Sequence, residues 1–212
     1  MLRAIGLLGG TFDPIHIGHL RIAIECRERL GLNEVKLLPA AIPPLKRSPN
    51  VGPQQRAAMV ELAIAQVPGL TLDTRELQRQ GVSYTVETLA LIRNEIDADT
   101  ALVWIMGTDS LEQLDRWHRW QDLLDFVNIA VLQRPGWQGV SHGPVAQWLA
   151  QHLCPPGQLC SQPSGGIALL EQPPLAISST AVRAALRERK NLQFLLPAPV
   201  IEYISDNDLY TH

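Results

Sequence analysis

The chain has 212 residues, of which 46% are hydrophobic and 18% are charged. This composition can build a packed core and excludes a wholly disordered chain. Its 18 basic and 21 acidic residues give a formal net charge of −3, so the overall charge favours neither nucleic acid nor an anionic membrane as a partner. At roughly 150 residues per domain, this length predicts a single domain over residues 1–212.

Cysteine content and apolar runs bear on the cellular compartment. Cys26, Cys154 and Cys160 are too few for a disulfide framework, which favours a reducing compartment. The apolar run at residues 4–8 is shorter than the core of a signal peptide. The run at 101–106 is far below the roughly 18 residues that span a bilayer. We therefore expect a cytoplasmic protein with no membrane partner.

Short apolar runs alternate with helical patterns, which predicts a parallel sheet of βα units. In chain order, strands are expected at 4–8, 35–38, 71–73, 102–106, 129–132 and 167–170. Helices are expected at 18–30, 53–67, 84–96, 145–153, 179–189 and 199–204. The expected fold class is therefore α/β: a doubly wound, Rossmann-like parallel sheet flanked by helices.

Two histidines follow the first expected strand. Residues 9–12 form a glycine-rich loop after that strand, and His16 and His19 stand three residues apart where the first helix begins. Ligands of open parallel sheets bind beyond the carboxyl ends of the strands, and a helix N-terminus there offers N–H groups to phosphate. The spacing fits neither the dinucleotide fingerprint nor the P-loop. Both imidazoles can donate to phosphate oxygens, most strongly when one is protonated.

Two other interpretations of these histidines stay open. In the first, His16 and His19 each have an ordinary structural role. His16, His19 and Cys26 could also form a metal site. Cys26, however, shares an apolar helical stripe with Ile22 and Leu30 and is better explained as a core residue.

Hydroxyl side chains begin the helix expected near the C-terminus. Ser178, Ser179 and Thr180 provide hydroxyls and free amides there, and Arg183 lies one turn later on the same end. These groups suit a phosphate ligand. The alternative is ordinary capping by Ser178 beside a solvated Arg183.

Both motifs resemble those of one enzyme superfamily. Residues 9–19 resemble the H-x-G-H signature of nucleotidyltransferases that move AMP or CMP from a nucleoside triphosphate to a phosphate acceptor, and residues 177–183 are similar to their I-S-S-T-x-x-R helix start. Over nearly its whole length the chain resembles bacterial nicotinate-nucleotide adenylyltransferases. This wider resemblance rests on Arg56 with Met59, on the segments 75–85 and 107–110, and on Trp117 and Arg134.

The resemblance implies AMP transfer from ATP to nicotinate mononucleotide, which gives deamido-NAD and pyrophosphate in NAD biosynthesis. It implies that the catalytic residues are His16, His19, Lys46 and Arg183. The implied ATP-binding residues are Gly9, Gly10, Thr11, Phe12, Gly107, Asp109, Ile177, Ser178, Ser179 and Thr180. The implied acceptor-binding residues are Thr85, Trp117, His118 and Arg134.

The implied roles are chemically reasonable. The nicotinate ring would stack on Trp117, a cation–π contact, and its carboxylate would meet donors near Thr85 and His118, at the helix start formed by residues 83–85. Asp109 would accept a hydrogen bond from a ribose hydroxyl. For Trp117 the alternative is a half-buried packing residue, and for Asp109 it is a helix N-cap.

No dedicated metal ligands are expected. Mg²⁺ should accompany ATP, held mostly by phosphates and water, because the sequence offers no carboxylate cluster. No nucleic-acid partner is expected, and association into a homo-oligomer stays open.

The chain departs from the family pattern in its proline-rich loop. Ala40 and Leu45 replace the family's usual Asn and His, which leaves Lys46 or Arg47 as the cation of this loop. Three other functions are weighed against the expected one: a different phosphate acceptor such as nicotinamide mononucleotide, a non-catalytic nucleotide-binding module, and a hydrolase. The hydrolase rests on a G-x-S-x-G match at 139–143, but no strand directly precedes it.

Overall fold

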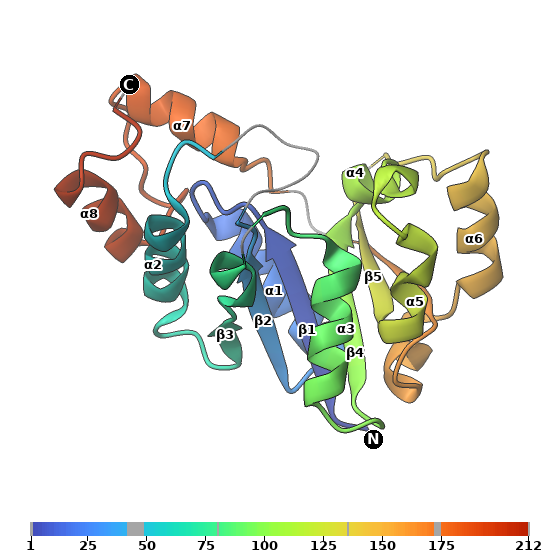
Figure 1. The fold of residues 1–212 in the computed structure, drawn as a ribbon. Coiled ribbons are helices and arrows are strands. Elements are labelled where there is room, and N and C mark those ends of the chain that lie inside the picture. The colour runs from blue at the N-terminus through green and yellow to red at the C-terminus, as the bar shows by residue number, and fades with distance from the viewer. Residues whose placement is uncertain (1, 42–48, 80, 135, 172–174, 212) are drawn as a thin grey trace.

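The computed structural model describes residues 2–41, 49–79, 81–134, 136–171 and 175–211 (Figure 1). Within them the strands are β1 (Ala4–Gly10), β2 (Glu34–Pro39), β3 (Leu70–Leu72), β4 (Ala101–Gly107), β5 (Asn128–Gln133) and β6 (Ile167–Glu171). The α-helices are α1 (Ile17–Leu30), α2 (Pro53–Ile64), α3 (Thr85–Glu95), α4 (Thr108–Leu111), α5 (Leu123–Phe126), α6 (Pro144–His152), α7 (Ser179–Arg187) and α8 (Ala198–Asp206). Short 3-10 helices are η1 (Arg75–Gln78), η2 (Leu114–Arg116), η3 (Trp120–Asp122) and η4 (Pro156–Ser161).

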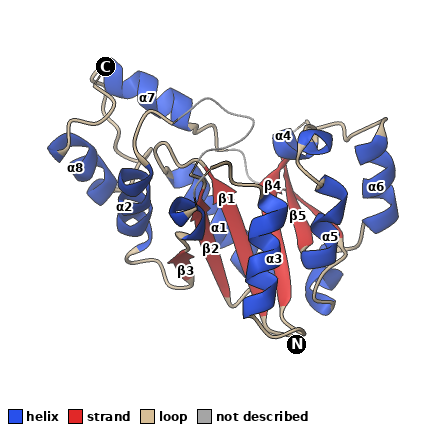
Figure 2. Cartoon of the chain, in the orientation of Figure 1, coloured by secondary structure: helices blue, strands red, loops and turns tan. Residues whose placement is uncertain are grey.

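The strands form one sheet in the order β3-β2-β1-β4-β5-β6, and every neighbouring pair is parallel (Figure 2). The chain winds outward from β1 in one direction and then, from β4, in the other. This confirms the predicted doubly wound, Rossmann-like sheet. In such sheets ligands bind beyond the carboxyl ends of the strands, at the switch point, which is the place where the order of the strands reverses. That point lies between β1 and β4, at the upper end of the sheet in Figure 1.

Helices cover both faces because successive side chains of a strand point to opposite faces. In β4, Val103 and Ile105 belong to one core cluster, whereas Leu102 and Trp104 belong to the other. Helices α1, α2, α7 and α8 pack on the first cluster, and α3, α5 and α6 pack on the second. Figure 1 shows α3 in front of the sheet and α1 behind it.

Two strands run farther than the apolar pattern predicts. β1 continues to Gly10, which pairs with Pro39, and β4 continues to Gly107, which pairs with Leu132. Glycine contributes no hydrophobic signal, so the expected strands stop too early. Because these extra residues are glycines, they place backbone without side chains at the ligand-binding end of the sheet.

Some helix boundaries also differ from the expected ones. The helix expected over 53–67 ends at Ile64, and the helix expected over 179–189 ends at Arg187. Arg189 has a left-handed backbone with φ 53°, which cannot continue a right-handed helix. Helices α4 and α5 were not predicted, because four residues are too few to show helical periodicity.

The helices of the described residues are short. The longest, α1, has 14 residues, whereas a helix that crosses a bilayer needs about 20. Among the described helices, none is long and apolar enough to cross a membrane.

Candidate active site

The carboxyl end of β1, which leads into the β1–α1 loop, approaches its neighbours too closely for side chains at its last two residues, Gly9 and Gly10. A Cβ on Gly9 would lie 2.3 Å from the ring of Trp104, and one on Gly10 would lie 2.8 Å from the ring of Phe12. Phe12 itself is buried, with φ 49°, and its ring meets the His19 ring edge to face at 5.0 Å. Glycine is therefore required where β1 enters the loop. Of the residues expected to bind ATP here, Phe12 serves as a buried support of the loop.

The two predicted histidines cap helix α1 together. The His16 Nδ1 accepts a hydrogen bond from the backbone N–H of His19 at 3.3 Å, and the His19 Nδ1 accepts from the backbone N–H of His16 at 3.2 Å. Their rings stack with centroids 3.6 Å apart. Because each Nδ1 accepts, each neutral ring carries its proton on Nε2. The pair thus carries two Nε2–H groups, close to the carboxyl end of β1.

Glycine at position 18 makes room for this pair. A Cβ there would lie 3.0 Å from Nδ1 of His16 and 3.6 Å from the Cβ of Ile177. Ile177, expected in the ATP site, therefore packs against the start of α1. The histidine pair and the segment before α7 meet through this contact, although they are far apart in the sequence.

His16 is neutral at physiological pH. It is 5% exposed, and burial lowers its pKa from the ordinary value of 6.5 to about 4. Protonation of His16 is therefore unfavourable, and that a protonated ring of the pair binds phosphate more strongly stays a prediction. Desolvation makes its charged form unfavourable, so the folded protein holds the neutral form of His16.

This shifted pKa predicts that acid weakens the fold. Between pH 6.5 and 4 the unfolded chain binds the His16 proton more readily than the folded chain does, so the free energy of unfolding falls as the pH falls through this window. The contribution that is lost is at most about 3 kcal/mol. Chemical denaturation at a series of pH values measures it.

The matched variant is His16→Asn, since asparagine is a good N-cap and does not titrate. We expect its stability to depend less on pH between 6.5 and 4 than that of the parent protein. The same pH dependence in both proteins would contradict this assignment.

The start of α7 packs on the β1–α1 loop. Ser178 caps the helix, accepting from the backbone N–H of Ala181 at 3.2 Å, while the Ser179 hydroxyl donates to the carbonyl of Pro14 at 3.0 Å. Ordinary capping by Ser178 is thus present. The Ser179 hydroxyl serves to join the two predicted phosphate motifs.

Arg183 also contacts this loop. Its Nη1 donates to the carbonyl of Asp13 at 2.6 Å and its Nη2 to the hydroxyl of Thr180 at 3.3 Å. Its side chain is 20% exposed. The alternative of a solvated Arg183 is therefore wrong. The guanidinium thus contacts, at Asp13, the loop that leads to the histidine pair.

Gly107, Asp109 and Arg134 meet at the ends of β4 and β5. Gly107 precedes α4 as its N-cap, so the alternative of Asp109 as the N-cap is wrong. The carboxylate of Asp109 pairs with Arg134 at 2.7 Å, and the two side chains are 59% and 71% exposed. The structure thus joins one residue expected to bind ATP with one expected to bind the acceptor, on the β4 side of the switch point.

Of the residues expected to bind the acceptor, Thr85 and His118 lie near the start of α3, whereas Arg134 is at the end of β5. Thr85 is the first residue of α3, and the ring of Tyr84 lies 4.5 Å from that of His118, which is exposed. Trp117 is half-buried and packs against the α3 side of the core. Ser83 is buried, so its hydroxyl is not offered to a ligand as expected.

Four further residues near the phosphate motifs were not predicted as site residues. Asp13 is buried and binds the side chains of Asn50 and Tyr210, and Arg56 is fully buried beneath the same loop. Arg56 has one recognisable signal, a charged residue on the buried face of a helix. Lys46, Arg47 and Leu45 lie outside the described residues, so Lys46 stays a prediction.

The metal and hydrolase alternatives do not fit the structure. Cys26 is fully buried in the core, its pKa raised by burial to about 12. In the part of the chain that the structure describes, no three His, Cys, Asp or Glu side chains are grouped to hold a metal ion. The Ser141 hydroxyl is hydrogen-bonded to the adjacent His142 ring at 2.9 Å, in an exposed irregular stretch before α6. This is not a strand-to-helix nucleophile turn.

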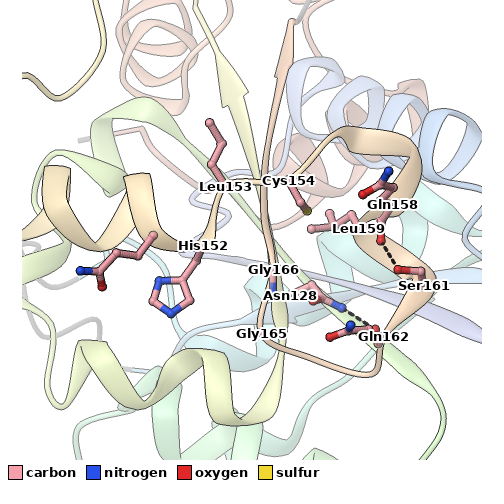
Figure 3. Close-up of a pocket in the computed structure, with 11 residues that line it drawn as sticks. Asn128, His152, Leu153, Cys154, Gln158, Leu159, Ser161, Gln162, Gly165 and Gly166 are labelled. Carbon is pink, nitrogen blue, oxygen red and sulfur yellow. Dashed lines mark hydrogen bonds between the residues drawn. The ribbon is translucent and has the colours of Figure 1, made fainter.

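A cavity of about 260 Å³ lies at the opposite end of the sheet (Figure 3). Asn128, the first residue of β5, lines it and donates to the carbonyl of Gln162 at 2.9 Å. His152, Cys154 and Gly166 also line it. None of the predicted site residues is among its lining residues, so it is separate from the candidate active site.

Residues 7–185 match the cytidylyltransferase-like family. With the Rossmann-like sheet and the histidine pair at its switch point, this match defines the class: the chain is a nucleotidyltransferase. It is 46% identical over 210 residues to a protein of Cellvibrio japonicus described as "Probable nicotinate-nucleotide adenylyltransferase", covering 99% of this chain and 100% of that one. A protein of Aeromonas salmonicida with the same description is 49% identical over 212 residues, covering 99% of each chain. The chain belongs to the nicotinate-nucleotide adenylyltransferase family.

The fold is also shared with a solved structure, "Plasmodium falciparum nicotinic acid mononucleotide adenylyltransferase complexed with NaAD". The TM-score is 0.73 at 16% identity, and the match covers 98% of this chain and 97% of that one. At this identity the likeness concerns the fold.

Proposed function

We propose that the protein transfers AMP from ATP to nicotinate mononucleotide, with release of pyrophosphate and formation of deamido-NAD. The observation that carries this function is the stacked pair His16 and His19 at the switch point, where α/β sheets bind nucleotides. Arg183 of α7 contacts the loop between β1 and this pair. The relatives named above support the choice of acceptor.

The reaction is a direct in-line displacement. A phosphate oxygen of nicotinate mononucleotide forms a bond to the α-phosphorus of ATP, while the bond from that phosphorus to the bridging oxygen breaks and pyrophosphate leaves with the electron pair. The acceptor phosphate is already an anionic nucleophile, so no covalent enzyme intermediate is needed. The protein's task is to position two polyanions and to neutralise the charge on the leaving group.

The protein's own groups suit this task. His16 and His19 supply Nε2–H donors whose rings are fixed by capping α1, and Arg183 and Lys46 supply positive charge. The positive ends of the helix dipoles of α1 and α7 add to this field. Fixed donors need no reorganisation during the reaction, which is the usual source of electrostatic catalysis.

Mg²⁺ fits the site as a companion of ATP. Because the described residues group no three acidic, His or Cys side chains as ligands, the triphosphate oxygens and water would hold the ion. When bound, it would neutralise charge on the phosphates and aid the departure of pyrophosphate.

The acceptor side rests on Trp117 and the start of α3. A nicotinate ring over the half-buried Trp117 would gain a cation–π contact, and its carboxylate would meet the free N–H groups and the Thr85 hydroxyl at the helix N-terminus. A nicotinamide lacks the negative charge that this end favours. We therefore expect a preference for the acid over the amide. We also assign the reaction to the cytoplasm, because the three cysteines are free thiols.

Pyrophosphate release tests the proposed function. Purified protein and Mg-ATP are offered nicotinate mononucleotide, nicotinamide mononucleotide or phosphopantetheine in parallel, with a control that contains no acceptor. We expect turnover with nicotinate mononucleotide well above the other arms. Preference for another acceptor would overturn the substrate assignment alone, and no turnover in any arm would favour a non-catalytic nucleotide-binding module.

A further inference from the structure

The carboxylate of Asp13 lies within the β1–α1 loop, between the histidine pair and the C-terminal segment. It is 4% exposed, and both of its oxygens accept hydrogen bonds. Oδ1 accepts from the hydroxyl of Tyr210 at 2.8 Å. Oδ2 accepts from the backbone N–H and the side-chain Nδ2 of Asn50, each at 2.9 Å. Three segments of the chain therefore meet at one buried carboxylate.

Tyr210 reaches Asp13 across 197 residues of sequence. Its ring is buried in the core cluster on the α1 side of the sheet, and its backbone has φ 64°. Burial and the negative charge of Asp13 raise the pKa of the tyrosine hydroxyl. The hydroxyl thus stays protonated and donates to the carboxylate.

Two arginines lie near this carboxylate, and they are used differently. Arg56 is fully buried and directs its guanidinium to the carbonyls of Thr11, Ala40 and Ala41. Arg183 places its Nη1 3.8 Å from Oδ2 of Asp13 and 2.6 Å from the Asp13 carbonyl. Arg183 also keeps part of its side chain exposed. Of the two, Arg183 can therefore reach a bound ligand.

We propose that Asp13 is a positioning residue for Arg183 and that the hydroxyl of Tyr210, at the C-terminal end of the chain, fixes Asp13 for this purpose. The proposal rests on the proposed function, in which Arg183 neutralises the leaving pyrophosphate. An arginine side chain has many rotamers, and the cost of ordering it would otherwise be met during the reaction. Asp13 and Thr180 order it in advance, which leaves its other N–H groups for phosphate oxygens.

The proposal separates a positioning role of Tyr210 from a merely structural one. If Tyr210 acts through Arg183, removing its hydroxyl should affect the step in which pyrophosphate leaves and should spare binding of the acceptor. It should also have no further effect once the Arg183 side chain is gone. If the bond from Tyr210 to Asp13 were merely structural, its loss would lower stability and would reduce kcat equally in the parent protein and in a variant without the Arg183 side chain.

A double-mutant cycle of Tyr210→Phe and Arg183→Ala makes this test. We expect Tyr210→Phe to lower kcat about 10-fold with the KM for nicotinate mononucleotide unchanged, because small misplacements of catalytic groups have effects of this size. In the Arg183→Ala background the same change should alter kcat less than about 2-fold. Tyr203→Phe is the control, since it removes a hydroxyl from α8 on a half-buried ring of the same core cluster.

An equal loss of kcat in both backgrounds would overturn the proposal, as would an unchanged kcat in Tyr210→Phe. Thermal unfolding shows whether each variant is folded at the assay temperature. Should Tyr210→Phe fail to fold, Asp13→Asn takes its place in the cycle, because it keeps the size of the side chain and removes the charge facing Arg183. It carries the same expectations, and the same results would overturn the proposal.

The result is distinguishable from failure of the proposed function. The parent protein's turnover in the acceptor panel decides that function on its own. If the parent turns over no acceptor, Mg-ATP affinity measured by calorimetry replaces kcat in the cycle. A weakening by Tyr210→Phe that disappears in the Arg183→Ala background then supports the positioning role, and an equal weakening in both backgrounds overturns it.

Discussion

Replacing His19 by alanine is expected to lower kcat about 100- to 1,000-fold, the usual effect of removing one fixed donor from a site that stabilises developing charge. The Nδ1 of His19 is occupied by the backbone N–H of His16, so the Nε2–H is the group of this ring that would meet phosphate. Its orientation is set by the stack with His16. Steady-state release of pyrophosphate measures the loss.

The capping role of His19 requires a control. Alanine removes the acceptor for the His16 N–H as well as the Nε2–H donor, and loss of such a cap costs about 1 kcal/mol of stability. His19→Asn keeps an acceptor at the position of Nδ1 and lacks the distal donor. We expect both variants to lose turnover alike while the asparagine variant retains more of the parent's stability. An asparagine variant with nearly full activity would contradict the role of Nε2–H.

The sheet could be predicted because its signals are local. Each apolar run between turn residues is a strand, and each begins and ends within a few residues of its predicted place. The two phosphate motifs could be found for the same reason, since His16 and His19, and Ser178 and Arg183, stand close together in sequence. The parallel order and its reversal at β1 and β4 follow from the alternation of strands and helices.

The connections within the site could not be predicted from sequence. The bond from Tyr210 to Asp13 spans nearly the whole chain, and no spacing rule reports such a pair. The mutual capping of the two histidines depends on ring rotamers, which the sequence does not specify. The lowered pKa of His16 could not be predicted either, because it depends on burial, a property of the tertiary structure.

For Arg56, the position on a helix could be predicted from the sequence, but the carbonyls that its guanidinium binds could not. It lies on the buried face of α2 with no exposed surface. Its guanidinium donates to the carbonyls of Val51, Thr11, Ala40 and Ala41 at 2.6 to 3.2 Å. Burial lowers its pKa, and the negative charge of Asp13 opposes this. One side chain thus satisfies carbonyls from the β1–α1 loop and from the segment after β2.

Replacing Arg56 by alanine is expected to destabilise the protein by about 3 to 5 kcal/mol, because the carbonyls lose their donors and a cavity forms in the core. This is a large share of the roughly 5 to 15 kcal/mol that stabilises a typical domain. Urea denaturation measures the change. Arg56→Lys should lie between the parent and the alanine variant, because an ammonium cannot reach several carbonyls with the geometry of a guanidinium.

Arg21→Ala is the matched control for charge, since Arg21 is an exposed arginine on α1 that pairs with Glu25 one turn away. We expect it to leave stability nearly unchanged, as exposed ion pairs usually do. Because the Thr11 carbonyl belongs to the loop that would hold the triphosphate, Arg56→Ala should also raise the KM for ATP at temperatures where it is folded. If Arg56→Ala were as stable as Arg21→Ala, water would satisfy the carbonyls in its place, and Arg56 would not be what holds these two segments together.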